Sequence, residues 1–174
     1  MTYKLITQIN EKILKEMIAL DEEVFKKEDV GIFAKCKEWI SANPDIYTVL
    51  TYQNKAIAYI NFIPISNTFY KKFKTGKLKD LSLTSKDIIS FNSSKPIKCL
   101  FTSIVVHQNF RNGETFEKLW KGFINKLKGF DFKISSIIMD CVTNIGELCA
   151  IKFLNGKFVC NSTTGKIYEG NLNL

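Results

Sequence analysis

The chain has 174 residues, of which 45% are hydrophobic and 24% are charged, and its formal net charge is +8. This length fits one domain with a sizeable core, and nine glycines and three prolines exclude collagen-like and proline-rich low-complexity classes. No apolar run reaches the roughly 18 residues of a membrane helix, and the first residues lack the long apolar stretch of a signal peptide. We therefore expect one domain over residues 1–174, located in the cytoplasm and without a membrane partner.

Hydrophobic spacing predicts regular structure in the first third of the chain. In order, we expect a strand at 3–8, a helix from Asn10 to Phe25, a helix at 32–40, and strands at 45–52 and 55–63. Asn10 is a favoured N-cap residue, and the second helix ends before Asn43-Pro44. Gln53-Asn54 between the two strands predicts a hairpin.

The pattern dissolves after Pro64, and we expect an insert at about 66–97 with a short helix near Ser85–Ser90. Residues 66–98 hold eight lysines against two aspartates, a net charge of +6, whereas the rest of the chain has a net charge of +2. Aromatic residues among lysines can bind single-stranded nucleic acid by stacking. We favour instead a short amphipathic element with its apolar side inward, and expect no nucleic-acid partner.

The last third predicts a mixed sheet. We expect a strand at 99–106 that is buried on both faces, a loop at 107–113, and then a helix with an apolar row from Phe116 to Leu127. A strand at 134–140, a helix at 145–154, and strands at 157–162 and 165–170 follow. Strand, helix and strand over 98–140 predict a parallel pair, and the flanking hairpins are antiparallel. The fold class is therefore α/β (α+β, mixed sheet): a mostly antiparallel sheet with one parallel βαβ pair and about four helices.

The strongest functional signal is the loop that joins the strand at 99–106 to the following helix. Arg111, the only arginine, lies there beside Asn112 and Gly113. Free N–H groups and the dipole at a helix N-terminus attract anions, and the planar guanidinium matches phosphate. The alternative is an Asn-Gly turn and helix cap beside a solvated arginine.

The run SIVVHQNFRNGETFEKLW resembles the cofactor motif of the GNAT superfamily of N-acetyltransferases. In that motif a strand ending in Val precedes an Arg-containing loop, and a helix carries Leu eight residues after the Arg; Val106, Arg111 and Leu119 match these positions. The order of elements over residues 3–170, apart from the insert, is similar too. The resemblance implies a GNAT-like fold and an acyltransferase that moves an acetyl group from acetyl-CoA to a small-molecule or peptide amine.

The resemblance also implies which residues hold the cofactor, mostly through main-chain groups. They are Val105, Val106, Arg111, Asn112, Gly113, Glu114, Thr115, Phe116 and Asn144. The two glycines of the family motif fall on Glu114 and Phe116, and the family's tyrosine falls on Lys152 or Phe153. The alternative is therefore a catalytically degenerate GNAT-fold binding module that binds acyl-CoA or a partner without transfer.

No catalytic residue is assigned from the sequence. The resemblance implies that a backbone N–H near Val105 or Val106 stabilises the oxyanion. The strand at 99–106 has no carboxylate, so a water relay would be needed, for which Ser103, Asp140 and Tyr168 are the candidates. The Lys-rich insert is a hypothetical lid that selects an acidic acceptor, and the strand edges of the C-terminal hairpin allow a homodimer.

The five cysteines form no C-x-x-C pair, and the single histidine is His107. A zinc site usually needs four closely spaced ligands, so we predict no metal. The odd, scattered count of cysteines suits reduced thiols. A Cys141–His107 nucleophile pair is an alternative that the sequence does not favour, because the two residues follow different strands.

Overall fold

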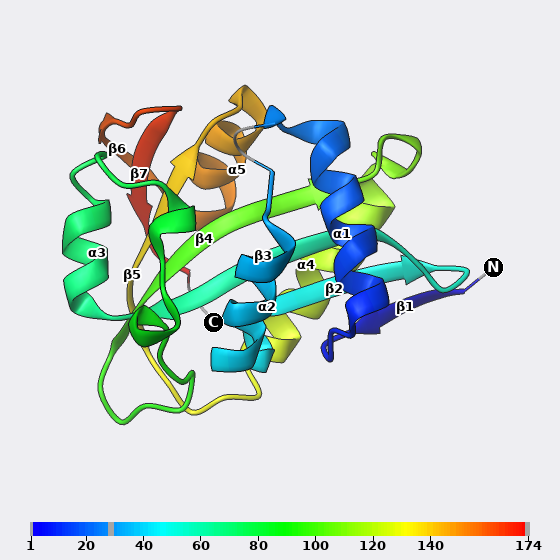
Figure 1. The fold of residues 1–174 in the computed structure, drawn as a ribbon, viewed down its shortest axis with the longest axis horizontal. Helices are drawn as coiled ribbons and strands as arrows, with labels where there is room; N and C mark the ends of the chain where they lie inside the picture. Colours follow the sequence, from blue (N-terminus) through cyan, green and yellow to red (C-terminus); the bar gives the residue numbers. More distant parts are fainter. Residues whose placement is uncertain (1, 28–29, 173–174) are drawn as a thin grey trace. The chain divides into compact units, whose positions relative to one another are not determined.

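The computed structural model describes residues 2–27 and 30–172 (Figure 1). It divides into two compact units, the first formed by Met1–Asn61 and Ser103–Gly129, the second by Phe62–Thr102 and Phe130–Leu174. The described strands form one sheet in the order β1-β2-β3-β4-β5-β7-β6. Strands β3 (Lys55–Ile65) and β4 (Ile97–Val106) each contribute residues to both units.

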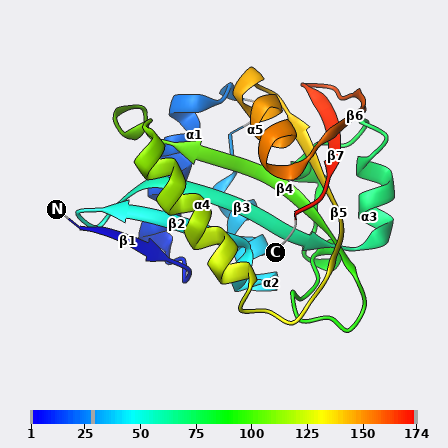
Figure 2. The same ribbon diagram turned by 180° about the vertical axis from the view of Figure 1, so that it is seen from behind.

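The first unit packs helices on both faces of its strands. Its elements are β1 (Tyr3–Ile6), α1 (Glu11–Val24), α2 (Phe33–Ala42), β2 (Tyr47–Tyr52), the first part of β3, the last part of β4, and α4 (Gly113–Leu127). Helices α1 and α2 cover one face (Figure 1), and α4 covers the opposite face (Figure 2). Strands β1, β2 and β3 pair antiparallel. The N-terminal elements expected from the sequence are confirmed, with ends shifted by a few residues.

Local signals explain where the N-terminal elements begin and turn. The Asn10 side chain accepts a hydrogen bond from Ile13 N at 2.9 Å, which caps α1. Gln53 and Asn54 have φ angles of 50° and 61°, and the twist of such a two-residue turn matches that of antiparallel strands. The hairpin predicted at Gln53-Asn54 is confirmed.

Helix α4 approaches the sheet closely. Leu119, Phe123 and Leu127 are buried against it, and each contributes about 1.5–3 kcal/mol by leaving water. Gly122 lies on the same side, where an added Cβ would stand 2.4 Å from Leu5 Cδ1. Near the end of α4, Lys126 Nζ donates to Asp45 O and to Tyr47 O, the second at 2.8 Å, and so ties the helix to the start of β2.

The partly buried ammonium of Lys126 makes stability depend on pH. Burial lowers its pKa from 10.5 to about 8. Between these two values the unfolded chain keeps a proton that the folded chain has released, so stability rises as the pH increases from 8 to 10.5. We expect the difference in unfolding free energy between wild type and Lys126→Met to shift in favour of wild type over this range in urea melts. The exposed Lys128→Met variant is the control, and an equal shift there would contradict the prediction.

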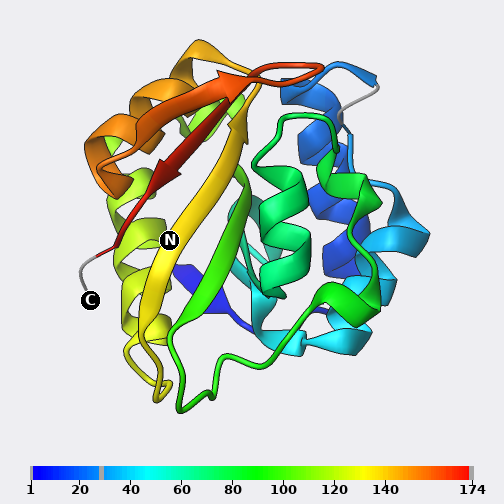
Figure 3. The same cartoon turned by 90° about the vertical axis from the view of Figure 1, so that its left-hand side faces the viewer.

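The second unit carries helices α3 and α5 on opposite faces of β5 and β7 (Figure 3). Its own elements are α3 (Asn67–Phe73), β5 (Ile134–Cys141), α5 (Asn144–Leu154), β6 (Lys157–Asn161) and β7 (Lys166–Gly170). Strands β4 and β5 pair parallel, and β5, β7 and β6 pair antiparallel. The predicted parallel pair and C-terminal hairpin are confirmed. The described part of the chain has five α-helices rather than about four, because the insert forms α3.

The Lys-rich insert is an amphipathic element, as we favoured. Phe69, Tyr70 and Phe73 of α3 are buried, and the lysines beside them, Lys71 and Lys72, are exposed. The aromatic rings are therefore not available to stack on bases. The short helix expected near Ser85–Ser90 is a 3₁₀ turn at Ser85–Asp87.

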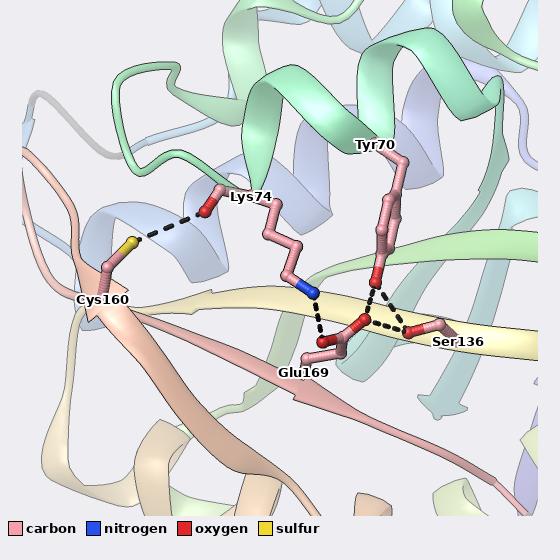
Figure 4. Close-up of polar contacts among 5 residues, drawn as sticks. All are labelled: Tyr70, Lys74, Ser136, Cys160 and Glu169. Carbon is pink, nitrogen blue, oxygen red and sulfur yellow. Dashed lines mark hydrogen bonds and ion pairs between the residues drawn. The ribbon is translucent and has the colours of Figure 1, made fainter.

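A polar cluster joins α3 to the sheet of the second unit (Figure 4). The Glu169 carboxylate of β7 accepts hydrogen bonds from Tyr70 Oη, from Ser136 Oγ at 2.9 Å and from Lys74 Nζ at 2.6 Å. The Lys98 ammonium lies 3.8 Å from the centre of the Tyr70 ring. This cluster holds the insert in one place on β5 and β7.

The burial of β4 differs from the prediction. Its register with β5 covers only Ile97 to Leu100, which pairs with Ile138. Thr102, Ser103 and Ile104, which follow, are half-buried, although the sequence predicted burial on both faces. Continuous apolar runs indicate fully covered strands only where neighbouring strands and helices pack along the whole length, and this prediction was wrong for the second half of β4.

Candidate functional site

The end of β4 and the start of α4 form a defined turn in the first unit. A 3₁₀ turn at Gln108–Phe110 follows His107, and the Phe110 ring packs 5.3 Å from that of Tyr52. Arg111 Nε donates to Val106 O at 3.1 Å. Arg111 is therefore tethered to the strand end by one nitrogen, while the terminal nitrogens of its exposed guanidinium keep their donors.

The first turn of α4 presents backbone donors. Asn112 caps the helix by accepting from Thr115 N at 2.9 Å, and the first helical hydrogen bond runs from Phe116 N to Asn112 O. The N–H groups of Gly113 and Glu114 thus lie at the positive end of the helix without an intrahelical acceptor. A Cβ added to Gly113 would meet no atom within 4 Å, so there is open space where a side chain at Gly113 would stand.

Glu114 and Phe116, which stand at the glycine positions of the family motif, each contact a residue one turn further along α4. Glu114 pairs with Lys118 at 3.1 Å, and the Phe116 ring stacks 6.0 Å from that of Trp120, with the two planes 9° apart. Thr115 is fully buried, and its Oγ1 has no hydrogen-bond partner among the described residues. The charge of Glu114 is thus partly offset by a lysine one turn further on.

Only some of the predicted site residues contact one another in the structure. Val106 and Arg111 are hydrogen-bonded, as are Asn112 and Thr115. Val105 is buried in β4. Asn144 belongs to the second unit, where it is the exposed first residue of α5.

Two of the three relay candidates have partners in the second unit. Asp140 accepts from Ser162 Oγ at 2.8 Å, and the same Ser162 oxygen accepts from Gly165 N at 2.7 Å. Tyr168 donates to Glu147 at 2.9 Å. Asp140 therefore fixes the turn between β6 and β7, while Tyr168 links β7 to α5.

Sequence reasoning missed a buried polar pair in the first unit. Tyr59 of β3 donates a hydrogen bond to the Asp21 carboxylate of α1, and both residues are buried. Desolvation and the Asp21 charge raise the pKa of Tyr59 well above its ordinary value. One signal was available, since Asp21 follows Met17 by four residues on the apolar side of the predicted helix.

The cysteine and histidine environments do not favour a Cys–His nucleophile. Burial, with the charges of Asp140 and Glu147, raises the pKa of the Cys141 thiol to about 12. His107 Nδ1 accepts from Asn109 N at 3.2 Å, and its Nε2 lies 3.7 Å from Glu23. All five cysteines are free. Over residues 2–27 and 30–172, no three His, Cys, Asp or Glu residues are grouped as a metal site would need, and no helix is long and apolar enough to cross a membrane.

Comparison with known proteins identifies the fold. No protein-family model matches the sequence, and no curated protein does. The structure is similar to the loading GNATL domain of CurA from Lyngbya majuscula, with a TM-score of 0.72, 10% identity and 98% coverage of both chains. It is also similar to the GphF GNAT-like decarboxylase in complex with isobutyryl-CoA, with a TM-score of 0.66, 10% identity and coverage of 99% and 100%.

Ard1 from Thermoplasma volcanium is a third similar structure, with a TM-score of 0.60, 11% identity, and coverage of 99% of this chain and 100% of that one. In this chain the compared fold consists of the mixed sheet, the parallel β4–β5 pair and the strand–turn–helix that ends in α4. This chain has the fold of the GNAT superfamily.

Proposed function

We propose that this protein binds an acyl-CoA at the end of β4 and the start of α4 and transfers the acyl group to an amine. The observation that carries the proposal is the Arg111 side chain, which is tethered to Val106 O beside the N-terminus of α4. Neighbouring structures include the GphF decarboxylase with isobutyryl-CoA and an N-acetyltransferase from Thermoplasma acidophilum with coenzyme A. The ligands bound in these two structures support the choice of acyl-CoA.

The residues of the first turn fit a pyrophosphate. Gly113 N–H and Glu114 N–H would donate to it, and the terminal nitrogens of Arg111 would add charge-assisted bonds. Gly113 has no side chain to obstruct the approach, and no atom stands where its Cβ would be. Because Glu114 is paired with Lys118, its repulsion of the phosphates is reduced.

In the proposed acyl transfer no protein side chain forms a covalent bond with the acyl group. The amine nitrogen attacks the thioester carbon, a C–N bond forms, and the C–S bond breaks to release the thiol of coenzyme A. A backbone N–H near Val105 or Val106 would stabilise the oxyanion. The acceptor we expect is a peptide or small-molecule amine, a choice supported by Arabidopsis thaliana Naa50 in complex with a CoA–peptide bisubstrate analogue.

Arg111→Ala should weaken coenzyme A binding about tenfold, because it removes charge-assisted hydrogen bonds at the end of a helix. Isothermal titration of wild type and variant with coenzyme A measures the change in Kd. The matched control is Lys128→Ala, which removes the same charge from an exposed position just after α4 and should leave the Kd unchanged. No binding by the wild type, or equal weakening in both variants, would contradict the proposed site.

The second candidate is an acyl-CoA-binding module without transfer. It is favoured by the tyrosine position of the family motif, where Lys152 and Phe153 are both exposed and neither is a suitable acid. An assay of coenzyme A release over a panel of amines separates the two candidates. Binding without release supports the module.

A further inference from the structure

The first unit contains a carboxylate that its apolar packing does not require. The Asp21 side chain is only 6% exposed, between α1 and β3, and accepts a hydrogen bond from Tyr59 Oη. Its second oxygen accepts from Gly31 N at 3.3 Å. Burying a carboxylate is costly unless it is hydrogen-bonded, and a carboxylate is a group that can accept a proton.

A second side chain, besides that of Asp21, contacts the Tyr59 hydroxyl. The Tyr59 hydroxyl also hydrogen-bonds to the Ser103 side chain on β4. Ser103 is half-buried, whereas Tyr59 is 2% exposed. Three groups on β4, β3 and α1 thus form a line that leads from a partly open hydroxyl to a buried carboxylate.

Ser103 lies close in sequence to the expected oxyanion donors. It stands after Leu100, where the register of β4 with β5 ends, and two residues before Val105. Residues two apart on a strand have side chains on the same face, about 7 Å apart. Ser103 Oγ is therefore on the same face of β4 as the Val105 side chain, the face on which we take the acceptor amine to approach.

We propose that Ser103, Tyr59 and Asp21 form a proton path that removes the proton of the acceptor ammonium during acyl transfer. The inference rests on the proposed transferase function and assigns the base that the fourth strand of the sheet lacks. Ser103 would contact the acceptor, while Tyr59 and Asp21 act through it as positioning residues.

The proton would pass from the acceptor ammonium to Asp21 in three transfers. Ser103 Oγ accepts a proton from the ammonium and gives its own to Tyr59 Oη, which gives its own to the Asp21 carboxylate. The freed amine attacks the thioester carbon, and its second proton goes to the thiolate of coenzyme A as the C–S bond breaks. The proton on Asp21 returns to solvent by the same path, so that the net products are amide, thiol and one proton. Desolvation and the Asp21 charge raise the pKa of Tyr59, which disfavours its anionic form, so Tyr59 would receive one proton as it gives up the other.

A purely structural role of these residues would change stability and leave the rate of transfer intact. Tyr59→Phe, Asp21→Asn and Ser103→Ala each interrupt the path, and Ser103→Thr keeps the hydroxyl. The control is Thr51→Val, which removes a buried hydroxyl that donates to Lys4 O in the same unit. Steady-state kinetics with acetyl-CoA and the best amine of the panel give kcat and KM, and titration gives the Kd for coenzyme A.

We expect kcat to fall about 100-fold in the three interrupting variants, the usual loss when a general base is removed, with the Kd for coenzyme A unchanged. Ser103→Thr should recover at least a tenth of the wild-type kcat, and Thr51→Val should keep it. Ser103→Ala, at a half-buried position, is the variant that keeps the test valid if Asp21→Asn fails to fold.

The experiment distinguishes failure of the proton path from failure of the transferase function. If the wild type transfers acyl groups and Ser103→Ala and Tyr59→Phe do so at the same rate, the proton path is wrong and the transferase function stands. If the wild type binds coenzyme A and acylates no amine, the transferase function and the path are both wrong, and the binding module remains.

Discussion

Gly170→Ala should destabilise the protein by about 3 kcal/mol or more. An added Cβ would stand 2.2 Å from Leu154 O, 3.1 Å from Leu154 C and 3.2 Å from Gly156 Cα. These atoms are backbone at the end of α5 and just after it, so they cannot rotate away as a side chain would. Leu154 O also accepts from Asn171 N at 2.7 Å. The clash must move α5 away from β7, and such overpacking of backbone is costly.

Equilibrium unfolding in urea measures the loss. Gly113→Ala is the matched control, because the same added methyl group meets no atom within 4 Å there and we expect a change below about 0.5 kcal/mol. Equal unfolding free energies for Gly170→Ala and Gly113→Ala would show that α5 and β7 do not approach as closely as described.

Glu169→Gln should cost about 2 kcal/mol, because it leaves three donors around a weaker acceptor. Partial desolvation alone would raise the pKa of Glu169, but hydrogen bonds from Lys74, Tyr70 and Ser136 lower it to about 2. The folded carboxylate thus keeps its charge below the usual value of 4.5. Its contribution is present above pH 4.5 and is lost as the pH falls toward 2.

Urea melts of wild type and Glu169→Gln between pH 7 and pH 2 test this directly. The difference between them should be largest near neutral pH and should shrink on acidification. Glu117→Gln is the control, since Glu117 is exposed and pairs only with Lys121 one turn along α4 in the contacts described. A difference that stays constant down to pH 2 would contradict the role of the Glu169 charge.

The sequence predicts most elements of this fold because their signals are local. Asn10 caps a helix, Gln53-Asn54 turns a hairpin, and the apolar row from Phe116 to Leu127 follows the helical period. All three features appear in the structure. The resemblance of the motif around Arg111 likewise led to the GNAT fold. The Arg111 side chain and the Val106 carbonyl that it contacts are only five residues apart, so this contact is local too.

What the sequence did not predict depends on residues far apart in the chain. Tyr70 and Glu169 are 99 residues apart, and Asp21 and Tyr59 are 38 apart, so no spacing rule joins them. The partial exposure of Ser103 was missed for the same reason, because burial on a strand is decided by its neighbours. Helix α3 was obscured by its length of seven residues, about two turns, which gives little periodicity.

The division of the chain constrains the order in which this protein can fold during synthesis. The first unit needs residues 103–129, and the second needs residues up to the C-terminal strand, yet residues 62–102 emerge between the two halves of the first. Neither unit is complete when residue 102 leaves the ribosome. The face of β2 and β3 that α4 covers must therefore stay uncovered until α4 is made, and holdase chaperones can act on it during that interval.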